Sequence, residues 1–260
     1  MSKWKRILTA LGIIVIVVGV YLNFFGFQTM TALIVRHQCR KLPDVARFPV
    51  ALADVSISDV PHTKVSYFGY QFELPWDDVD EQKDKTVGQI HVSAFRSGNA
   101  FWFSTFPPKE FLNEFMKDSK LDQQSFRQLF GDEAFESDYG FHRRMLQMTP
   151  SQITPFISRR EAAAGSMLLM VKAISIPKAD SGIFLIQTPE FKGFQFESPE
   201  SRPARITDYV YSNDAGIELM FLQKLGGSAP SISQSEVNRV IQSIHKVSAQ
   251  VVALKTNGNH

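Results

Sequence analysis

The side chains best placed for chemistry are five acids and a histidine in the first half of the chain. The acids lie between residues 77 and 84: Asp77, Asp78, Asp80, Glu81 and Asp84. His91 follows them in a segment with the alternation of a strand. Carboxylates beside a histidine could perform the general acid–base steps of a hydrolase or a lipid-modifying enzyme. Because no apolar sequence surrounds the acids to desolvate them, we expect instead a solvated helix start, with the acids near the positive end of the helix dipole.

Metal and cofactor chemistry lacks the residue spacing that it requires. The six histidines are scattered, and none has another four positions away as in a helical metal site. A calcium loop starting at Asp78 would have Lys83 in place of its glycine and Gln89 in place of its closing glutamate. We therefore interpret His91 as a hydrogen-bonded polar residue within a strand, and we expect no metal, no cofactor and no catalytic residue.

One serine motif occurs near the C-terminal end. Ser243 and Lys246 match the SxxK string of penicillin-recognising serine enzymes, but the companion SDN and KTG strings are absent. The serine also lies late in an amphipathic pattern typical of a terminal helix, so we interpret the match as a chance occurrence. P-loop, dinucleotide-binding and nucleophile-elbow motifs are absent from the sequence as well.

Aromatic residues form a second group of candidates: Tyr67, Phe101, Trp102 and Phe103. Alternation along a strand would turn half of them outward, where exposed aromatic side chains form an interaction surface for a lipid, a glycan or a peptide. Packing in the core or along an edge strand is the ordinary alternative for such residues.

Behind these candidates, strand and helix patterns succeed each other along the chain. A period of two predicts one strand over residues 65–74, ended by Pro75. Residues 89–95 and 100–106 are expected to form a hairpin, since Gly98 and Asn99 supply a tight turn between them. Helical spacing then appears over residues 111–116, 125–135 and 149–173. Residues 161–174 are apolar but too short to cross a bilayer, so we expect them to be the central buried helix of the domain.

The last third of the chain returns to strand patterns and closes with a helix. The expected strands cover residues 182–188, 191–197, 206–212 and 217–224, with a hairpin loop over 213–216. Ser233 and Glu236 form a capping box at the start of the terminal helix, whose apolar face consists of Val237, Val240, Ile241 and Ile244. This order of elements indicates an α+β fold, with an antiparallel sheet packed with helices.

The N-terminal region reads as a membrane anchor. Residues 7–27 contain no charge, and Lys3, Lys5 and Arg6 immediately precede them. About 20 apolar residues match the thickness of a bilayer. This run exceeds the apolar core of a cleaved signal peptide, and no small-x-small cleavage site follows it. We therefore expect one uncleaved transmembrane helix, with a cleaved signal peptide as the alternative.

Basic residues on both sides of this segment bear on orientation and lipid contact. Lys3, Lys5 and Arg6 favour a cytoplasmic N-terminus, and the soluble domain would then be extracytoplasmic. Past the span, residues 30–41 are expected to continue as a helix, on which Arg36, Arg40 and Lys41 could meet lipid phosphates. The expected layout is a basic tail at 1–6, a transmembrane helix at 7–27, a juxtamembrane helix and connector at 28–63, a single α+β domain at 64–248 and a flexible tail at 249–260.

Composition excludes several classes of function. The chain has 28 basic and 26 acidic residues, so the part that remains without the three basic residues of the tail carries 25 against 26. A neutral domain offers no electrostatic footprint for nucleic acid. The single cysteine, Cys39, excludes an internal disulfide and a cysteine-based zinc site. We expect a buried or lipid-adjacent thiol, with a cross-link between two chains as the alternative.

Two short stretches resemble PsbP-like domains. Residues 70–76 (YQFELPW) are similar to the opening strand of that family, an aromatic-rich strand that runs into Pro with a Trp nearby. Residues 240–244 (VIQSI) resemble its terminal helix, which often closes with a hydrophobic-Ser-hydrophobic string. The resemblance implies a central antiparallel sheet with helices on both sides and an accessory or assembly role. It carries over no functional residue.

Together these patterns predict a single-pass, membrane-anchored protein with a non-catalytic binding or accessory domain in the cell envelope. Its expected partners are the lipid bilayer and another membrane or envelope protein. Two alternatives stay open: a membrane-tethered hydrolase or lipid-modifying enzyme that uses the acids and His91, and a carrier that holds a lipid or another ligand in an aromatic-lined cavity.

Overall fold

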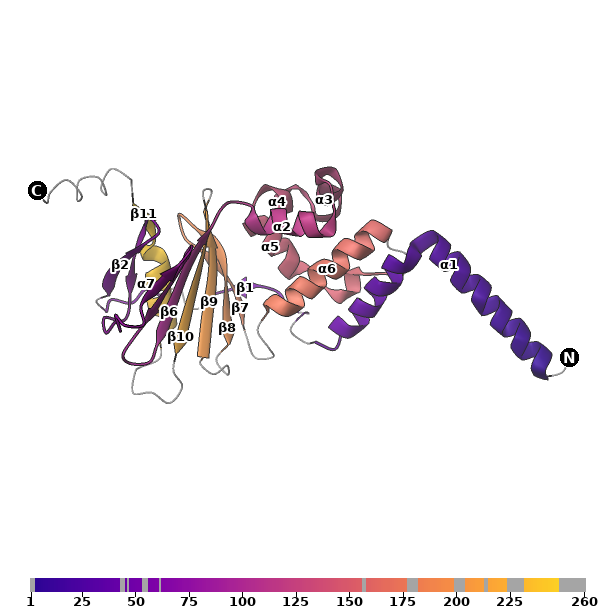
Figure 1. Ribbon diagram of the computed structural model, residues 1–260, viewed down its shortest axis with the longest axis horizontal. Helices are drawn as coiled ribbons and strands as arrows, with labels where there is room; N and C mark the ends of the chain where they lie inside the picture. The colour runs from indigo at the N-terminus through magenta and orange to yellow at the C-terminus, as the bar shows by residue number, and fades with distance from the viewer. Residues whose placement is uncertain are drawn as a thin grey trace, which may run out of the picture. The chain divides into compact units, whose positions relative to one another are not determined.

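A computed structural model describes residues 3–42, 45, 47–52, 56–60, 62–155, 158–176, 182–198, 204–212, 215–223 and 232–247. For residues 3–12, 25, 27–28, 159–160, 175, 198 and 204 it describes the backbone alone. The chain divides into two compact units (Figure 1). The helical unit comprises Met1–Phe48, Phe111–Glu136 and Gly140–Ile176, and the sheet unit comprises Pro49–Glu110, Ser137–Tyr139 and Pro177–His260. This division differs from the single domain expected over residues 64–248, because residues 111–136 and 140–176 group with the N-terminal helix.

The helical unit starts with a long helix that is bent at a glycine. Helix α1 spans Lys3–Cys39, and Gly26 within it has φ 72° and ψ 176°, a conformation that a residue without a Cβ adopts at low cost. The halves Ile13–Phe24 and Thr29–Cys39 meet at 98°. Within the part of the chain that the structure describes, no single helix is both long enough and apolar enough to cross a bilayer, and these halves pass that test only as a bent pair. The transmembrane helix expected over residues 7–27 stays a prediction.

The other helices of this unit follow in sequence order: α2 (Glu110–Ser119), α3 (Gln123–Phe130), α4 (Asp132–Glu136), α5 (Asp138–Gln147), the 3-10 turn η2 (Pro150–Gln152) and α6 (Arg159–Ser175). Helix α6 contacts α1 and lies beside its second half (Figure 1). Four side chains of this half at helical spacing are buried, namely Thr29, Ala32, Val35 and Cys39. The helices expected near residues 111–116 and 125–135 are confirmed. The helical region expected over 149–173 is interrupted, because residues 153–155 between η2 and α6 are not helical, while its apolar part at 161–174 lies in α6. Helix α5 was not foreseen because its sequence alternates charged and aromatic residues without a clear apolar stripe.

The sheet unit contains an eight-stranded sheet in the order β1-β7-β8-β9-β10-β6-β5-β4. Its strands are β1 (Val50–Ala51), β4 (Lys85–Val87), β5 (Ile90–Ala94), β6 (Ala100–Phe106), β7 (Ile183–Gln187), β8 (Lys192–Ser198), β9 (Ala204–Tyr211) and β10 (Gly216–Gln223). The expected hairpin of β5 and β6 and the four late strands are confirmed. The sheet is mixed rather than antiparallel, because β1 pairs with β7 in parallel at Val50↔Phe184 and Ala51↔Leu185.

A second sheet and a helix complete this unit. The sheet has the order β11-β3-β2, from His245–Lys246, Tyr70–Leu74 and Thr63–Tyr67, and helix α7 spans Gln234–Ser243. The single strand expected over residues 65–74 is wrong: Phe68 (φ 49°) and Gly69 (φ 80°) form a tight turn, so this segment is the β2–β3 hairpin. Two successive residues at positive φ are typical of two-residue hairpin turns. Alternation persists through such a turn, which explains why it resembled one strand.

The core of the sheet unit lies between one face of the large sheet and the layer formed by α7 and the small sheet. Phe72 stacks on Phe103 with ring centroids 4.9 Å apart, and Phe101 lies 5.2 Å from Phe221. From α7, Val237, Val240 and Ile241 enter the same core, as the predicted apolar face required. The register places a row of side chains on this face, running from His91 through Phe103, Leu219 and Asp208 to Gln195.

Candidate functional site beneath helix α7

Helix α7 is fixed at its start by the expected capping box. Ser233 Oγ accepts a hydrogen bond from the Glu236 backbone N–H at 3.3 Å, and Glu236 Oε2 accepts one from the Ser233 backbone N–H at 2.6 Å. Both bonds satisfy N–H groups that a helix start otherwise leaves unpaired. The apolar face of the helix then determines which side faces the sheet.

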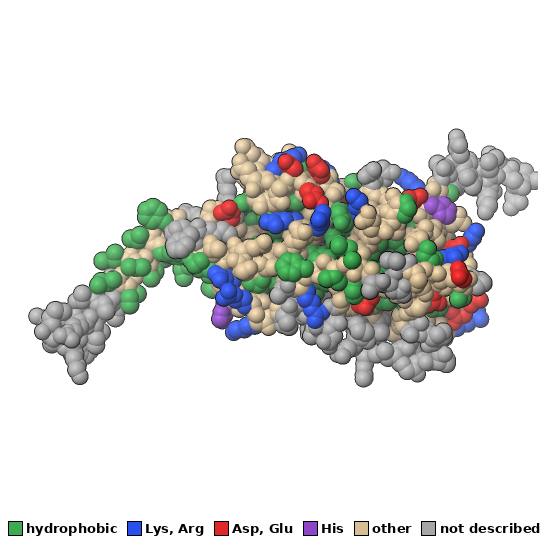
Figure 2. All heavy atoms as spheres, turned by 180° about the vertical axis from the view of Figure 1, so that it is seen from behind, with side chains coloured by type: hydrophobic (Ala, Val, Ile, Leu, Met, Phe, Trp, Pro, Cys, Tyr) green, Lys and Arg blue, Asp and Glu red, His purple; other side chains and the backbone are tan. Residues whose placement is uncertain are grey.

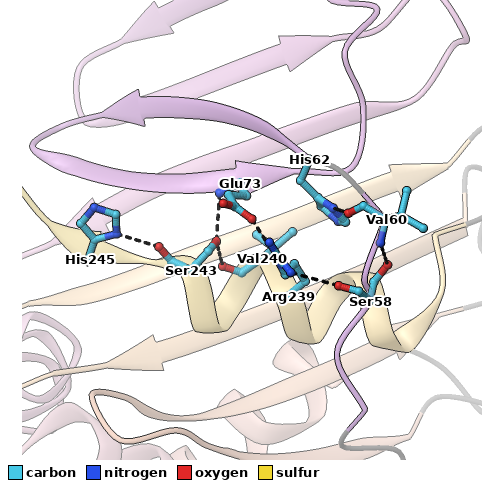
Figure 3. Close-up of polar contacts among 8 residues, drawn as sticks. All are labelled: Ser58, Val60, His62, Glu73, Arg239, Val240, Ser243 and His245. Carbon is cyan, nitrogen blue, oxygen red and sulfur yellow. Dashed lines mark hydrogen bonds and ion pairs between the residues drawn. The ribbon is translucent and has the colours of Figure 1, made fainter.

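An ion pair and two serines tie α7 to the small sheet and to the segment before β2 (Figure 3). Arg239 Nε donates to Glu73 Oε2 on β3 at 2.7 Å, and its Nη1 donates to the Ser58 carbonyl at 3.2 Å. Ser243 Oγ donates to the Val240 carbonyl at 2.8 Å and accepts from the Glu73 backbone N–H at 2.9 Å. The SxxK serine thus has a structural role at the end of α7, while Lys246 is exposed on β11.

Beneath the start of α7, amide side chains form a hydrogen-bonded chain. Gln195, fully buried on β8, donates to Gln234 Oε1 and to Glu197 Oε1, each at 2.7 Å. Gln234 donates to Asn238 Oδ1 at 2.9 Å, and Asn238 donates to the Ser56 carbonyl at 2.8 Å. Buried polar groups need such partners, because an unpaired one costs about 1–3 kcal/mol. The chain therefore fixes the register of α7 against β8.

Asp208 lies next to this amide chain but does not join it. The residue is directly opposite Gln195 on β8 and Leu219 on β10, and it is fully buried. Neither carboxyl oxygen has a hydrogen-bond partner among the described residues. Burial raises the pKa of Asp208 well above its usual value, and the nearby Glu197 carboxylate raises it further. Asp208 is therefore a neutral acid in the core, since an uncompensated buried charge would be far more costly.

An open groove lies beside the amide chain, between α7 and the end of β7. About 390 Å³ of empty space, part of it open solvent, lies along the groove. Leu52, Ile186 and Ile241 supply its apolar lining, and Asn238 belongs both to this groove and to the amide chain. Gln187 and Gln242 are exposed at its rim. Apolar walls with a few amide groups suit a ligand that offers apolar side chains and peptide groups.

The groove also borders one edge of the large sheet. Among the described residues, β1 pairs only with Phe184 and Leu185 of β7, and the groove is lined from Leu185 through Thr188. A strand edge beside an apolar groove is the arrangement that binds an extended peptide by strand addition.

The structure brings His91 and Asp84 together, as the acid–base alternative requires. His91 Nε2 lies 3.2 Å from Asp84 Oδ1 and 3.0 Å from Ser93 Oγ, and His91 Nδ1 lies 2.8 Å from Thr86 Oγ1. In a serine hydrolase the acid and the serine occupy different nitrogens of the histidine. Here both approach Nε2, and Ser93 is fully buried beneath Tyr67, whose ring stacks on His91 at 3.7 Å. This arrangement satisfies a core histidine and offers no access for a substrate, so the interpretation of His91 as a hydrogen-bonded strand residue is confirmed.

The other acids of the cluster do not start a helix, so that expectation is wrong. Residues 77–84 form a loop and a turn. Asp78 Oδ2 accepts from the Ser97 backbone N–H at 2.7 Å, and Asp80 pairs with Lys83 at 2.8 Å. The hydrogen bond from Lys83 lowers the pKa of the Asp80 carboxyl. The acids thus stabilise backbone turns next to the β5–β6 hairpin.

The expected aromatic surface is largely core. Phe101 and Phe103 are fully buried, so neither can contribute to an interaction surface. Tyr67 is half-buried, and its hydroxyl lies 3.0 Å from Ser93 Oγ. Trp102 is half-buried on the opposite face of the sheet, where its Nε1 has no partner among the described residues. Tyr67, Phe101 and Phe103 thus pack against other aromatic rings of the core.

Of the basic residues expected to contact lipid headgroups, the structure describes the side chains of three. The side chains of Lys3, Lys5 and Arg6 lie outside the described residues. Arg36 is half-buried, and Arg40 and Lys41 are exposed. Cys39 is a free, buried thiol of the helical unit, as one of its two interpretations predicted.

Sequence reasoning missed a second buried ionisable group, Lys172 on α6. Its side chain is fully buried, and Nζ donates to the carbonyls of Arg47, Leu146 and Met148 at 2.9, 2.6 and 2.8 Å. These three acceptors use all three donors of an ammonium group. Burial lowers the pKa of Lys172 to about 8. The signal was visible, since Lys172 is the one charge in the apolar run that follows Glu161.

Comparison with known proteins supplies no relative from which a role could be inferred. No family model, no curated protein and no solved structure matches the chain. The resemblance to PsbP-like domains stays a prediction.

Proposed function

We propose that this chain is a single-pass membrane-anchored protein whose sheet unit is a non-catalytic binding or accessory module in the cell envelope. The observation that carries the proposal is the exposed first half of α1, and Figure 2 shows hydrophobic side chains along it. Eight large apolar side chains of this half are 45–71% exposed: Ile13, Ile14, Val15, Ile16, Val17, Val18, Val20 and Phe24. Consecutive helical residues point 100° apart, so these exposed apolar groups surround the helix. A helix that is apolar on every side suits hydrocarbon and not water.

Charge supports one orientation of this anchor. The sequence has Lys3, Lys5 and Arg6 directly before the apolar run, which favours a cytoplasmic N-terminus. The sheet unit would then be extracytoplasmic, and the groove beside α7 would face other proteins of the envelope. We expect the partner to be a membrane or envelope protein that supplies an extended segment to the β7 edge.

Membrane attachment is tested with the full chain in cell fractions. We expect it to sediment with membranes, to resist extraction by high salt and alkaline carbonate, and to be released by detergent. A charge in the apolar helix, Val17→Asp, should move most of the protein to the soluble fraction. Val87→Asp is the matched control, because Val87 on the edge strand β4 has a similar exposure of 67% against 60%. Release of the unaltered chain by salt or carbonate would contradict the proposal.

The binding role is tested by photocrosslinking in intact cells. A photoreactive residue at Gln187 or Gln242, on the rim of the groove, should give one discrete adduct with an envelope protein. The same residue at Glu81, an exposed position in the acidic turn, should not give that adduct. Equal labelling from all three positions would indicate nonspecific proximity and would remove the groove from the proposal.

A further inference from the structure

The second half of α1 has two faces that differ in character. Thr29, Ala32, Val35 and Cys39 form the buried face of this half, and α1 packs against α6. At 100° per residue, Met30, Ile34, His37 and Lys41 lie on the opposite side of the helical path. Met30 and Ile34 are 39% and 55% exposed. Backbone hydrogen bonds from Arg40 N to Arg36 O and from Lys41 N to Gln38 O, each 3.0 Å, continue the helical path beyond Cys39.

The charge on this segment has a single sign. No acidic residue occurs anywhere in α1, Lys3–Cys39, whereas Arg36, Arg40 and Lys41 cluster at its end. None of these three makes an ion pair with another described residue. Arg36 Nε also lacks a hydrogen-bond partner within the described part of the chain. The outward face therefore offers Met30 and Ile34 followed by Lys41, and the exposed Arg40 lies at its flank; neither cation is paired with an acid among the described residues.

The bend at Gly26 sets the orientation of Thr29–Cys39 relative to the bilayer. Ile13–Phe24 and Thr29–Cys39 meet at 98°, so a first half that stands upright in a bilayer leaves the second half parallel to the bilayer surface. We propose that Thr29–Cys39 is an interfacial helix whose outward face binds anionic phospholipid headgroups. Met30 and Ile34 enter the boundary between headgroups and acyl chains, and Arg40 and Lys41 contact lipid phosphates. This inference rests on the proposed membrane anchor.

Two features favour anionic lipid as the ligand of this face: its short distance along the chain from the apolar helix, and its basic residues. The face begins a few residues after the exposed apolar helix, so its distance from the bilayer is set by the chain itself. A basic cluster next to an anchor is attracted to anionic lipid within about a Debye length of the surface. Apolar side chains beside such basic residues are typical of helices that lie in the interface.

The test uses the full chain reconstituted into vesicles of phosphatidylcholine alone or with phosphatidylglycerol. In a Cys39→Ser background, Ile34→Cys carries a fluorophore, and quenching by lipids with a nitroxide near the headgroup reports its depth. We expect strong quenching with phosphatidylglycerol, and at least a twofold loss of it in the Arg40→Gln, Lys41→Gln double variant or at high salt. Lys117→Gln with Lys120→Gln is the charge-matched control at exposed sites of the same unit and should leave quenching unchanged.

Vesicle flotation separates the two proposals. A chain that fails to float with either vesicle contradicts the membrane anchor itself. A chain that floats while the label at position 34 stays unquenched overturns only the interfacial helix. Quenching that is equal in both lipids, and insensitive to the basic residues, overturns the assignment to anionic headgroups. Quenching that requires an added protein would show that a protein occupies this face.

Discussion

Asp208 and Gln195 are directly opposed on β9 and β8, yet no hydrogen bond joins their side chains. Gln195 donates instead to Glu197 and Gln234, and the buried carboxyl group of Asp208 has no hydrogen-bond partner in the described part of the chain. The amide chain thus fixes α7, while the acid next to it is held neutral by its surroundings. Two neighbouring polar residues on one face therefore have opposite effects on the stability of the sheet unit.

The pH dependence of stability should reveal Asp208. The pKa of Asp208 is higher in the folded than in the unfolded state. Its contribution to the free energy of unfolding is therefore complete below the unfolded pKa and is lost as pH rises through the folded pKa. Asp208→Asn removes this titration. As pH rises between the two pKa values, the free energy of unfolding of the variant should increase relative to that of the unaltered protein by up to about 1.4 kcal/mol per pH unit. Urea unfolding at a series of pH values, followed by tryptophan fluorescence, measures the difference.

The control for Asp208 is Asp77→Asn, which alters an exposed acid near the β5–β6 hairpin. It should shift the unfolding curves little at any pH. If Asp208→Asn and the unaltered protein kept a constant difference from acid to neutral pH, the neutral buried acid would be refuted.

Lys172 should produce the opposite slope in the helical unit. Burial lowers its pKa from 10.5 to about 8, so the folded state releases the proton first and stability rises with pH between these values. The rise should total at most about 3.4 kcal/mol, and Lys172→Met should abolish it. Denaturant unfolding followed by far-ultraviolet circular dichroism provides the measurement. The exposed Lys83, altered to Met, is the control, and a rise that survives in Lys172→Met would assign it to another group.

The Arg239–Glu73 pair should contribute more than a surface pair of equal length. Both it and Arg143–Glu133 have N–O distances of 2.7 Å, but the side chains are 34% and 20% exposed in the first pair and 45% and 65% exposed in the second. Lower exposure reduces solvent screening, so a double-mutant cycle with alanine should give a coupling of about 1 kcal/mol for Arg239–Glu73. The cycle for Arg143–Glu133 should give about 0.2 kcal/mol. Equal coupling energies would mean that the pair does not fix α7.

His91 should behave as a structural residue when it is altered. His91→Ala removes the stack on Tyr67 and one of the two partners of Ser93, and we expect a loss of about 2–4 kcal/mol in the free energy of unfolding. Asp84→Ala, at a side chain that is one-third exposed, should cost less than about 1 kcal/mol. An acid–base pair would predict the contrary pattern, in which both variants lose a hydrolytic activity and neither loses stability.

Local patterns predicted much of this fold because several elements are specified by neighbouring residues. The Ser233–Glu236 capping box and the Gly98-Asn99 turn operate within a few positions of the chain. The β2–β3 hairpin escaped prediction because Phe68 is an unusual residue at positive φ, and alternation continues across the turn. The parallel pairing of β1 was also beyond reach, since two residues carry no pattern.

The candidate site depended on contacts between distant segments. Asp208 alternates with Ile206 and Val210 in the sequence, so an acid in an apolar row was visible, but its lack of a partner follows from where Gln195 points. Only the acid–base alternative placed the acids of residues 77–84 near His91, and the contact of Asp84 through a single nitrogen could come only from the turn geometry between β4 and β5. Chemistry at such sites is decided by orientation, which a spacing rule does not contain.

The three carbonyls around Lys172 also make that amine a reporter of local opening. Acylating reagents modify exposed lysines at once, but the Lys172 nitrogen can react only when α6 separates from the carbonyls of residues 47, 146 and 148. Its modification rate, measured by peptide mass spectrometry, would give the rate of local opening in the helical unit alone. The concealed thiol of Cys39, alkylated in a parallel sample, would show whether α1 leaves α6 in the same event.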